Sequence, residues 1–199
     1  MSEKTNNRLY LMITITNRVK GATHFIDFYR AFGAPVVFTA LGRGTASNDI
    51  LNTLGLDQGK YILLSAHREE NIDIEENFFS LMNAVNAMAE KYDMPILYSC
   101  HPRSKKYIEQ RGFVFDRRVI RHEPLGFFDY NKLQQNAFCV VSDSGTLPEE
   151  GAYFRFPAVS VRTSTERPEA MENGIFTVGC ITTEQVLQAV ALATSMHAD

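Results

Sequence analysis

The stretch FCVVSDSGTLPEEG, residues 138–151, joins an apolar run to a short polar turn and the first residues of a helix. Every position of FCVV is apolar, and such runs are typical of strands that are buried on both faces of a sheet. Sheets of this kind are parallel, because the helices that return the chain to the next strand cover both faces. The stretch therefore predicts a parallel sheet flanked by helices on each side.

The same alternation of strand and helix extends in both directions from this stretch. Short apolar runs bounded by loops occupy residues 61–65, 95–100, 118–122, 138–143, 157–161 and 175–179. Apolar residues at helical spacing lie between them, over 75–91, 103–111, 127–136, 147–153 and 183–195. Strands and helices that alternate at this pace form right-handed βαβ units. We predict a Rossmann-like, doubly wound parallel α/β sheet over residues 60–199.

The first 59 residues have a different pattern. RLYLMITITN (8–17) alternates and is rich in β-branched residues, residues 21–32 have helical spacing, and PVVFTALG (35–42) is a second apolar run. A short helix through Leu54 follows, and Gly55 is placed to end it. We therefore predict two parts, a β-α-β segment over 1–59 and the α/β domain over 60–199.

The composition is that of an ordinary globular protein. The 199 residues are 45% hydrophobic and 22% charged, and 20 basic against 23 acidic side chains give a net charge of −3. This balance argues against a general nucleic-acid binder, and no apolar run is long enough for a membrane helix. Cys100, Cys139 and Cys180 lack disulfide or zinc-ligand spacing and suggest reduced thiols in a cytoplasmic protein. No motif indicates a metal or a cofactor.

In a doubly wound sheet, ligands bind beyond the C-terminal ends of the strands, so the polar turn after FCVV is the first candidate site. We expect Ser144, Gly145 and Thr146 at a helix N-terminus, where backbone N–H groups and the helix dipole favour a phosphate. Glu149 and Glu150 fall in the first turn, from which one carboxylate could reach ribose hydroxyls. The alternative is a plain helix cap, with serine as the cap and glutamate in the first turn.

A second polar cluster, SAHREENID (65–73), follows the apolar run at 61–65. His67 could contact a phosphate or a sugar, and Arg68 could pair with a carboxylate or phosphate. The alternative is a surface loop whose charges pair with one another.

Three further segments follow predicted strands, and with the two above they make up the rim, meaning the polar residues at the C-terminal ends of the strands. TSTERPEAMENG (163–174) contains Arg167, which either touches the ligand or pairs with a carboxylate such as Glu166. CHPRS places His101 and Arg103 after another strand. In EPLGFFDY, Tyr130 could stack on a base, although packing in the core is the more frequent use of an aromatic residue.

Taken in order, HREEN, HPRS, PLGFFDY, SDSG-x-x-x-EE and TERPE resemble the C-terminal half of the non-hydrolysing UDP-N-acetylglucosamine 2-epimerases, over residues 60–199. SAHREENID resembles the branch that acts on UDP-2-acetamido-2,6-dideoxy sugars, on the route to N-acetylfucosamine. The resemblance implies the C-terminal domain of a glycosyltransferase-B-type fold, in which two Rossmann-like domains enclose the active site. It also implies an isomerase of polysaccharide biosynthesis.

The resemblance assigns roles to individual residues. Ser144 and Gly145 would bind the diphosphate of UDP or a UDP-N-acetylhexosamine, and Glu150 the ribose hydroxyls. Tyr130 would lie at the uracil, and His67 would be the catalytic residue that faces the diphosphate and the reacting sugar. Arg68, Glu149 and Arg167 would support them.

This sequence departs from the family pattern in two places. Thr146 stands where a glycine is usual and Pro148 where a glutamine is common. The family reaction eliminates UDP from the sugar and adds it back with the opposite configuration at C2. Its carboxylates come from an N-terminal domain that residues 1–59 do not resemble. The resemblance therefore implies UDP binding with weak or absent turnover, in a chain that self-associates as a homo-oligomer.

Residues 8–58 instead resemble the start of a PII-like signalling protein, through NRVKG (17–21) and LGRGTAS (41–47). This second resemblance implies a ferredoxin-like β-α-β piece. It leaves two alternatives to an epimerase domain, namely a PII-like regulatory module that binds an adenine nucleotide or an anion, and a catalytically silent chimera.

Overall fold

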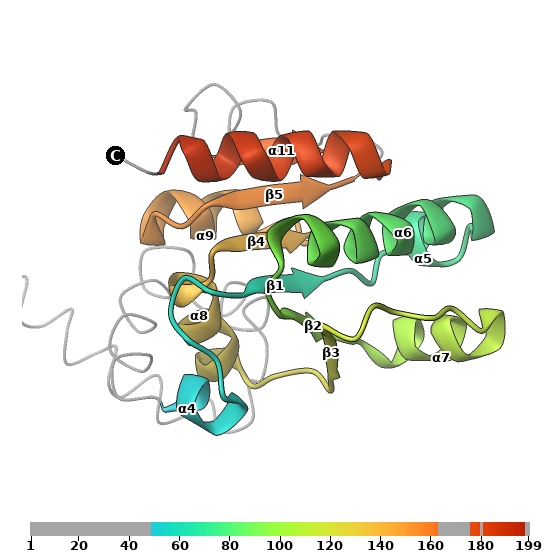
Figure 1. Cartoon of the computed structure of the whole chain (residues 1–199), viewed down its shortest axis with the longest axis horizontal. Helices are drawn as coiled ribbons and strands as arrows, with labels where there is room; N and C mark the ends of the chain where they lie inside the picture. Colours follow the sequence, from blue (N-terminus) through green and yellow to red (C-terminus); the bar gives the residue numbers. More distant parts are fainter. Residues whose placement is uncertain (1–48, 163–175, 180, 198–199) are drawn as a thin grey trace, which may run out of the picture. The chain divides into compact units, whose positions relative to one another are not determined.

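The computed structural model describes residues 49–162, 176–179 and 181–197 (Figure 1). The elements predicted over residues 8–47, with most of the PII-like resemblance, lie outside the described residues, as do Arg167 and Cys180. The chain divides into two compact units, one of which comprises residues 51–124 and 133–199. Leu125–Lys132 belong to the other unit. The sheet lies within the unit that comprises residues 51–124 and 133–199.

The described strands are separated by helices from β1 to β5, with two helices, α5 and α6, between β1 and β2. The strands are β1 (Ile62–Ser65), β2 (Ile96–Ser99), β3 (Val119–His122), β4 (Cys139–Ser142), β5 (Ala158–Val161) and β6 (Phe176–Gly179). The helices are α4 (Ile50–Leu54), α5 (Glu69–Ile72), α6 (Glu75–Tyr92), α7 (Pro102–Arg111), α8 (Phe127–Asn136), α9 (Leu147–Phe154) and α11 (Thr183–Ser195).

All six strands pair in parallel, in the order β3-β2-β1-β4-β5-β6. The order reverses between β1 and β4, whose ends align because Ser65 pairs with Ser142. Connections leave this pair of strands in opposite directions, and in folds of this kind the ligand lies at the carboxyl ends of such a pair. The topology confirms the predicted Rossmann-like sheet and marks the place where a ligand binds in such folds.

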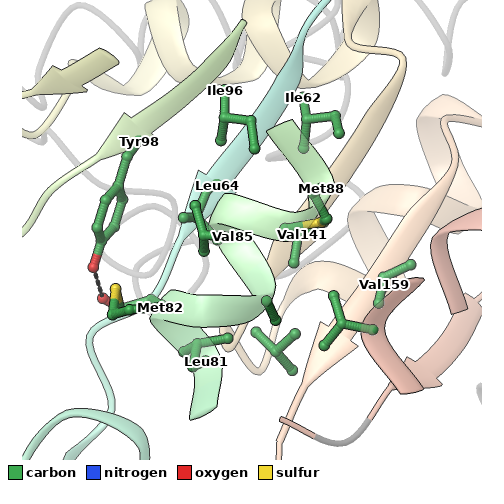
Figure 2. Close-up of a cluster of buried hydrophobic side chains, with 14 of the residues drawn as sticks. Ile62, Leu64, Leu81, Met82, Val85, Met88, Ile96, Tyr98, Val141 and Val159 are labelled. Carbon is green, nitrogen blue, oxygen red and sulfur yellow. Dashed lines mark hydrogen bonds between the residues drawn. The ribbon is translucent and has the colours of Figure 1, made fainter. Parts of the chain in front are cut away.

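One face of the sheet packs against α6 and α11, which lie side by side (Figure 1). Alternate residues of the strands point to this face, among them Ile62 and Leu64, and both are fully buried. Figure 2 shows these side chains against α6, where Leu81, Val85 and Met88 recur at helical spacing. The apolar residues that recur at helical spacing over 75–91 thus form the side of α6 that packs on the strands.

The opposite face of the sheet is covered as well. Leu63, Val140 and Ala158 alternate with the residues of the first face and are also fully buried. Helix α9 approaches closely, because a Cβ at Gly151 would lie only 3.2 Å from the Cβ of Ala158. A residue without a side chain allows this close approach of helix and strand. Helices on both faces confirm the doubly wound arrangement.

Two boundaries differ from the prediction in ways that matter for the site. The strand predicted over residues 138–143 ends at Ser142, so Asp143 is the first residue beyond the sheet. Part of the polar segment 65–73 forms the short helix α5, because Asn71 and Ile72 both donate backbone hydrogen bonds to the Arg68 carbonyl. Four residues are too few to show an apolar period, and the sequence pattern therefore did not reveal this helix.

The described cysteines fit the expectation of core thiols. Cys100 and Cys139 are both free and buried, and burial raises the pKa of each thiol, that of Cys100 to about 11. Among the described residues, no helix combines the length and the apolar character that a membrane crossing requires.

Candidate functional site

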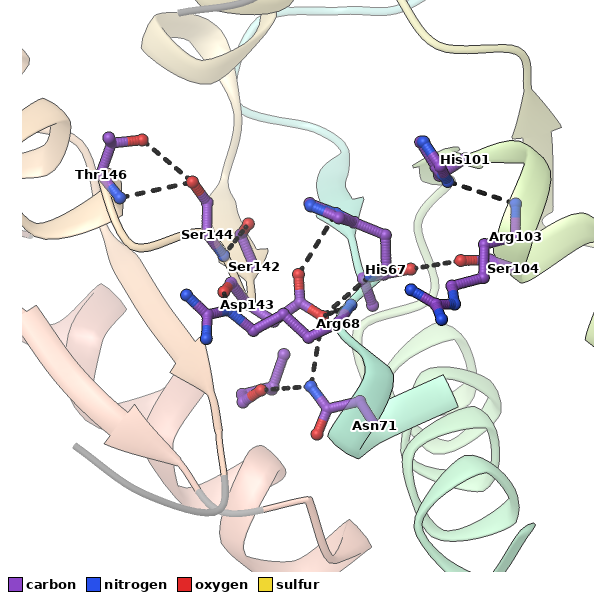
Figure 3. A network of polar contacts seen from close by, with 12 residues as sticks. His67, Arg68, Asn71, His101, Arg103, Ser104, Ser142, Asp143, Ser144 and Thr146 are labelled. Atoms are coloured by element: carbon purple, nitrogen blue, oxygen red, sulfur yellow. Dashed lines mark hydrogen bonds and ion pairs between the residues drawn. The ribbon is translucent and has the colours of Figure 1, made fainter. Parts of the chain in front are cut away.

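The polar residues that follow β1 and β4 meet at the carboxyl edge of the sheet (Figure 3). His67 and Arg68 come from the loop after β1, and Ser144 and Thr146 from the turn after β4. His101, at the start of α7 after β2, lies beside them, with its ring centroid 5.6 Å from that of His67. The structure therefore brings together two clusters that are about 75 residues apart in the sequence.

Asp143 fastens these two strand ends to each other. Its side chain is fully buried, and its Oδ2 accepts hydrogen bonds from the backbone N–H groups of His67 and Arg68, both at 2.8 Å. The same oxygen accepts a bond of 3.2 Å from the Asn71 side-chain amide, which also donates to the Val161 carbonyl on β5 at 2.8 Å. One carboxylate thus holds the β1 loop against β4, and Asn71 extends the connection to β5.

Sequence reasoning missed both Asp143 and Asn71. The strand predicted over 138–143 includes Asp143. Asn71 is the last of the five consecutive polar residues HREEN (67–71), and nothing in the sequence sets it apart from the other four. The position of Asp143 directly after an apolar strand was the available signal, because the first residue past a buried strand lies at the ligand-binding edge.

His67 lies at the surface of this network. Its side chain is 41% exposed, and its Nδ1 is 3.4 Å from the Asp143 Oδ1. Arg68 is held differently, since its Nε donates to the Asp143 carbonyl at 2.8 Å. Its Nη2 would lie 3.5 Å from a Cβ at Gly145, so the guanidinium group lies next to the turn after β4. The predicted pair His67 and Arg68 therefore does lie beside the predicted phosphate turn.

The turn after β4 is held by its own hydroxyl groups. The Ser144 backbone N–H donates to the Ser142 hydroxyl at 3.1 Å, and the Ser144 and Thr146 hydroxyls are hydrogen-bonded at 2.9 Å. Within the described residues, the Gly145 N–H has no protein acceptor. Thr146 is the N-cap residue of α9, and its side chain makes no bond to a helix N–H. The Ser144 hydroxyl accepts a long bond of 3.4 Å from the Thr146 backbone N–H.

Glu150, in the first turn of α9, is buried and only 3% exposed. Its Oε1 accepts a hydrogen bond of 2.7 Å from the Thr146 hydroxyl, and its Oε2 accepts one from the Gln134 side-chain amide. Burial raises the pKa of Glu150 from the ordinary 4.5 to about 7, and the two hydrogen bonds oppose this rise. Each carboxylate oxygen has a second lone pair that can accept from a ligand.

The cluster after β2 has a structural use. The His101 Nδ1 accepts from the Arg103 N–H at 3.2 Å and so caps α7. The Arg103 guanidinium pairs with Glu69 at 2.9 Å and with Asp73 at 3.1 Å. These bonds hold α5 and α7 beside the rim.

Tyr130 is in the part of α8 that belongs to the other compact unit, and Arg167 lies outside the described residues. The described residues hold no cluster of three or more His, Cys, Asp or Glu side chains that could bind a metal ion.

The arrangement suits an anion. An arginine, an imidazole, a serine hydroxyl and a backbone N–H gather at the N-terminus of α9, and these are the donors that bind phosphate groups. The strand order defines a Rossmann-like α/β domain, and these donors lie at the β1–β4 switch, which is where such domains bind their ligands.

Residues 32–199 match the family model of UDP-N-acetylglucosamine 2-epimerase, and the chain belongs to this family. It is 32% identical over 137 residues to the UDP-N-acetylglucosamine 2-epimerase of Methanocaldococcus jannaschii, which covers 66% of this chain and 37% of that protein. It is 35% identical over 117 residues to the enzyme of Methanococcus maripaludis, which covers 57% of this chain and 32% of that protein. The chain thus spans about a third of these curated relatives.

Solved structures of UDP-N-acetylglucosamine 2-epimerases are similar to this chain as well. UDP-N-acetylglucosamine 2-epimerase from Rickettsia bellii is 33% identical with a TM-score of 0.70, over 81% of this chain and 43% of that one. The M. jannaschii enzyme in complex with UDP-GlcNAc and UDP is 26% identical with a TM-score of 0.70, over 79% and 46%. These neighbours confirm the predicted fold class, a Rossmann-like domain of the glycosyltransferase-B type.

None of these matches supports the PII-like resemblance, and the family match already begins within the segment assigned to it, at residue 32. The division of the chain at residue 60 stays a prediction.

Proposed function

We propose that this chain binds UDP or a UDP-N-acetylhexosamine, with the diphosphate at the N-terminus of α9. One observation supports this most strongly: Asp143 joins the His67–Arg68 loop to the Ser144–Thr146 turn, so that donors from both strand ends lie together at the carboxyl edge of the sheet. The M. jannaschii relative forms a complex with UDP-GlcNAc and UDP. The diphosphate would receive hydrogen bonds from the Gly145 N–H and from the Ser144 hydroxyl, which would turn toward it from the Thr146 hydroxyl. Arg68 would supply positive charge.

The nucleoside would lie beyond the diphosphate. Glu150 is the proposed acceptor for the ribose hydroxyls, through the lone pairs that Thr146 and Gln134 leave unused. Tyr130 is the proposed contact of the uracil. Glu149 and Arg167 are proposed to support the bound nucleotide.

The proposed reaction class is epimerisation at C2 through elimination and re-addition of UDP. His67 would face the diphosphate and the reacting sugar, from the loop that Asp143 holds in place. Elimination also requires carboxylates that act as acid and base at C2. Asp143 and Glu150 are both buried and already accept hydrogen bonds from the protein. We therefore propose that recognition of UDP is retained while turnover is weak or absent.

Removal of the Ser144 hydroxyl tests the diphosphate site. Ser144→Ala should weaken both UDP and pyrophosphate by about 10- to 100-fold, since a hydrogen bond to a charged group contributes about 1.5 to 3 kcal/mol. Glu150→Gln should weaken UDP much more than pyrophosphate, because only UDP carries the ribose. Calorimetric titration of both ligands measures these affinities.

Ser195→Ala is the matched control, because Ser195 is exposed and its hydroxyl donates only to the Leu192 carbonyl within α11. It should leave both affinities unchanged. If Ser144→Ala lowers the melting temperature and leaves both affinities intact, the Ser144 hydroxyl is a structural group and the proposed diphosphate site is wrong.

Turnover is tested in D₂O. With UDP-N-acetylglucosamine as substrate, we expect little or no deuterium at C2 under conditions in which calorimetry shows UDP bound, because the Asp143 and Glu150 carboxylates already accept hydrogen bonds from the protein. Proton NMR of the sugar follows the exchange. Rapid incorporation of deuterium would contradict the proposal of weak turnover and would leave the proposal of UDP binding intact.

We further propose that the chain works in the cytoplasm as a homo-oligomer. The free, buried thiols of Cys100 and Cys139 support a reducing compartment.

A further inference from the structure

The two oxygens of the Asp143 carboxylate have different surroundings. Oδ2 accepts three hydrogen bonds, two from backbone N–H groups and one from Asn71. Oδ1 is fully buried and has no hydrogen-bond partner in the described part of the chain. The nearest polar group recorded for it is the His67 Nδ1, at 3.4 Å (Figure 3). The oxygen is therefore an acceptor that lacks a donor, with an imidazole nitrogen just beyond hydrogen-bond distance.

His67 can supply that donor with a small movement. Its ring is 41% exposed, and its backbone N–H is already anchored to Oδ2 of the same carboxylate. A neutral imidazole carries its proton on either Nδ1 or Nε2, and the neighbours of each nitrogen decide which tautomer forms. A buried acceptor without a donor is costly, so the form with the proton on Nδ1 is favoured here.

We propose that Asp143 is a positioning residue for His67: it holds the Nδ1–H tautomer and thereby turns Nε2 into the ring nitrogen that meets the ligand. The role of Nε2 toward a diphosphate rests on the proposed function, whereas the tautomer is a property of the ligand-free protein. In this form Nε2 is the basic nitrogen, and a proton taken up there makes it a donor to a phosphate oxygen.

Arg68 and His101 also lie near His67, but neither takes the place of Asp143 as the acceptor for the Nδ1 proton. Arg68 directs its Nε to the Asp143 carbonyl and has no lone pair to accept the Nδ1 proton. His101 uses its own Nδ1 as the acceptor that caps α7. Asp143 is thus the acceptor that the structure places at Nδ1.

Asp143→Asn changes the group that faces the His67 Nδ1 while keeping the hydrogen bonds that support the loop after β1. The asparagine oxygen can replace Oδ2, because three donors face that position, which directs the amide NH₂ group toward the His67 Nδ1. A donor at this point requires Nδ1 to act as the acceptor, so the proton moves to Nε2. The loop is preserved and the tautomer is reversed.

Long-range ¹⁵N–¹H correlation spectra of the ligand-free protein at pH 8 report the tautomer. His67 is assigned by its loss in His67→Gln. We expect a protonated Nδ1 and an unprotonated Nε2 in the wild type, and the reverse in Asp143→Asn. Asp73→Asn is the matched control, since Asp73 pairs with Arg103 and does not contact His67, and it should leave the His67 signals unchanged.

A wild-type spectrum with the proton on Nε2 would overturn the inference, even if Asp143→Asn failed to fold. An unchanged tautomer in a folded Asp143→Asn would also overturn it. UDP titration is a separate measurement. If the tautomer reverses as expected but UDP binds neither protein, the inference about Asp143 stands and the proposed function fails.

Discussion

Glu150→Gln is expected to gain stability relative to the wild type as the pH rises, by about 3 kcal/mol between pH 4.5 and pH 8. Burial raises the pKa of Glu150 from 4.5 to about 7, so the folded state binds a proton more tightly than the unfolded state. A difference of one between the folded and unfolded pKa values corresponds to about 1.4 kcal/mol of stability. The contribution of Glu150 to stability is fully present below pH 4.5 and is lost as the pH rises to about 7. Glutamine does not titrate and escapes this loss.

Urea unfolding followed by circular dichroism at pH 5 and pH 8 measures the difference. Thr146→Val is the companion variant, because it removes a hydrogen bond that lowers the pKa of Glu150. The loss of stability should then extend to higher pH than in the wild type. Parallel pH profiles for the wild type and Glu150→Gln would show that burial of Glu150 does not control this titration.

Leu81→Ala should lower the free energy of unfolding by about 2 to 5 kcal/mol, which is the range for deletion of a buried leucine side chain. Leu81 is fully buried in the layer between α6 and the sheet, where Val85 and Val141 also lie (Figure 2). Its removal would leave a cavity that the packed neighbours fill only in part. Thermal and urea unfolding both report the change.

Leu192→Ala makes the same chemical change on α11, where the side chain is 52% exposed. Its effect should remain within about 0.5 kcal/mol. Equal losses for the two variants would contradict the placement of the core between α6 and the sheet.

The periodicity of apolar residues predicted most of the described fold. All six strands and the helices α6, α7, α8, α9 and α11 lie within two residues of their predicted limits. The prediction succeeded best for the buried strands β1, β2, β4 and β5, where burial on both faces leaves runs such as CVV apolar at every position. Turn chemistry contributed too, since Gly55 has a positive φ of 64° at the end of α4, as expected for a C-terminal glycine.

The same reasoning expected the candidate phosphate-binding residues at the ends of two strands, where the structure has them, but it did not explain what holds them. Ser144, Gly145 and Thr146 were expected at a helix N-terminus, and they precede α9. His67 and Arg68 were expected at the end of a neighbouring strand. Their attachment through Asp143 was not foreseen, because a carboxylate and two backbone N–H groups about 75 residues apart leave no pattern in the sequence.

By itself, the sequence determined the alternation of strand and helix, the parallel sheet and the residue types at each strand end, because burial and turn formation act on neighbouring residues. Only the tertiary structure decided that β1 and β4 are adjacent, that Asp143 is withdrawn from solvent, and that Glu150 is buried with a raised pKa. Hydrogen bonding and desolvation depend on which groups meet in space. The order of the strands in the sheet decides which groups come together, and this order is established only when the whole sheet assembles.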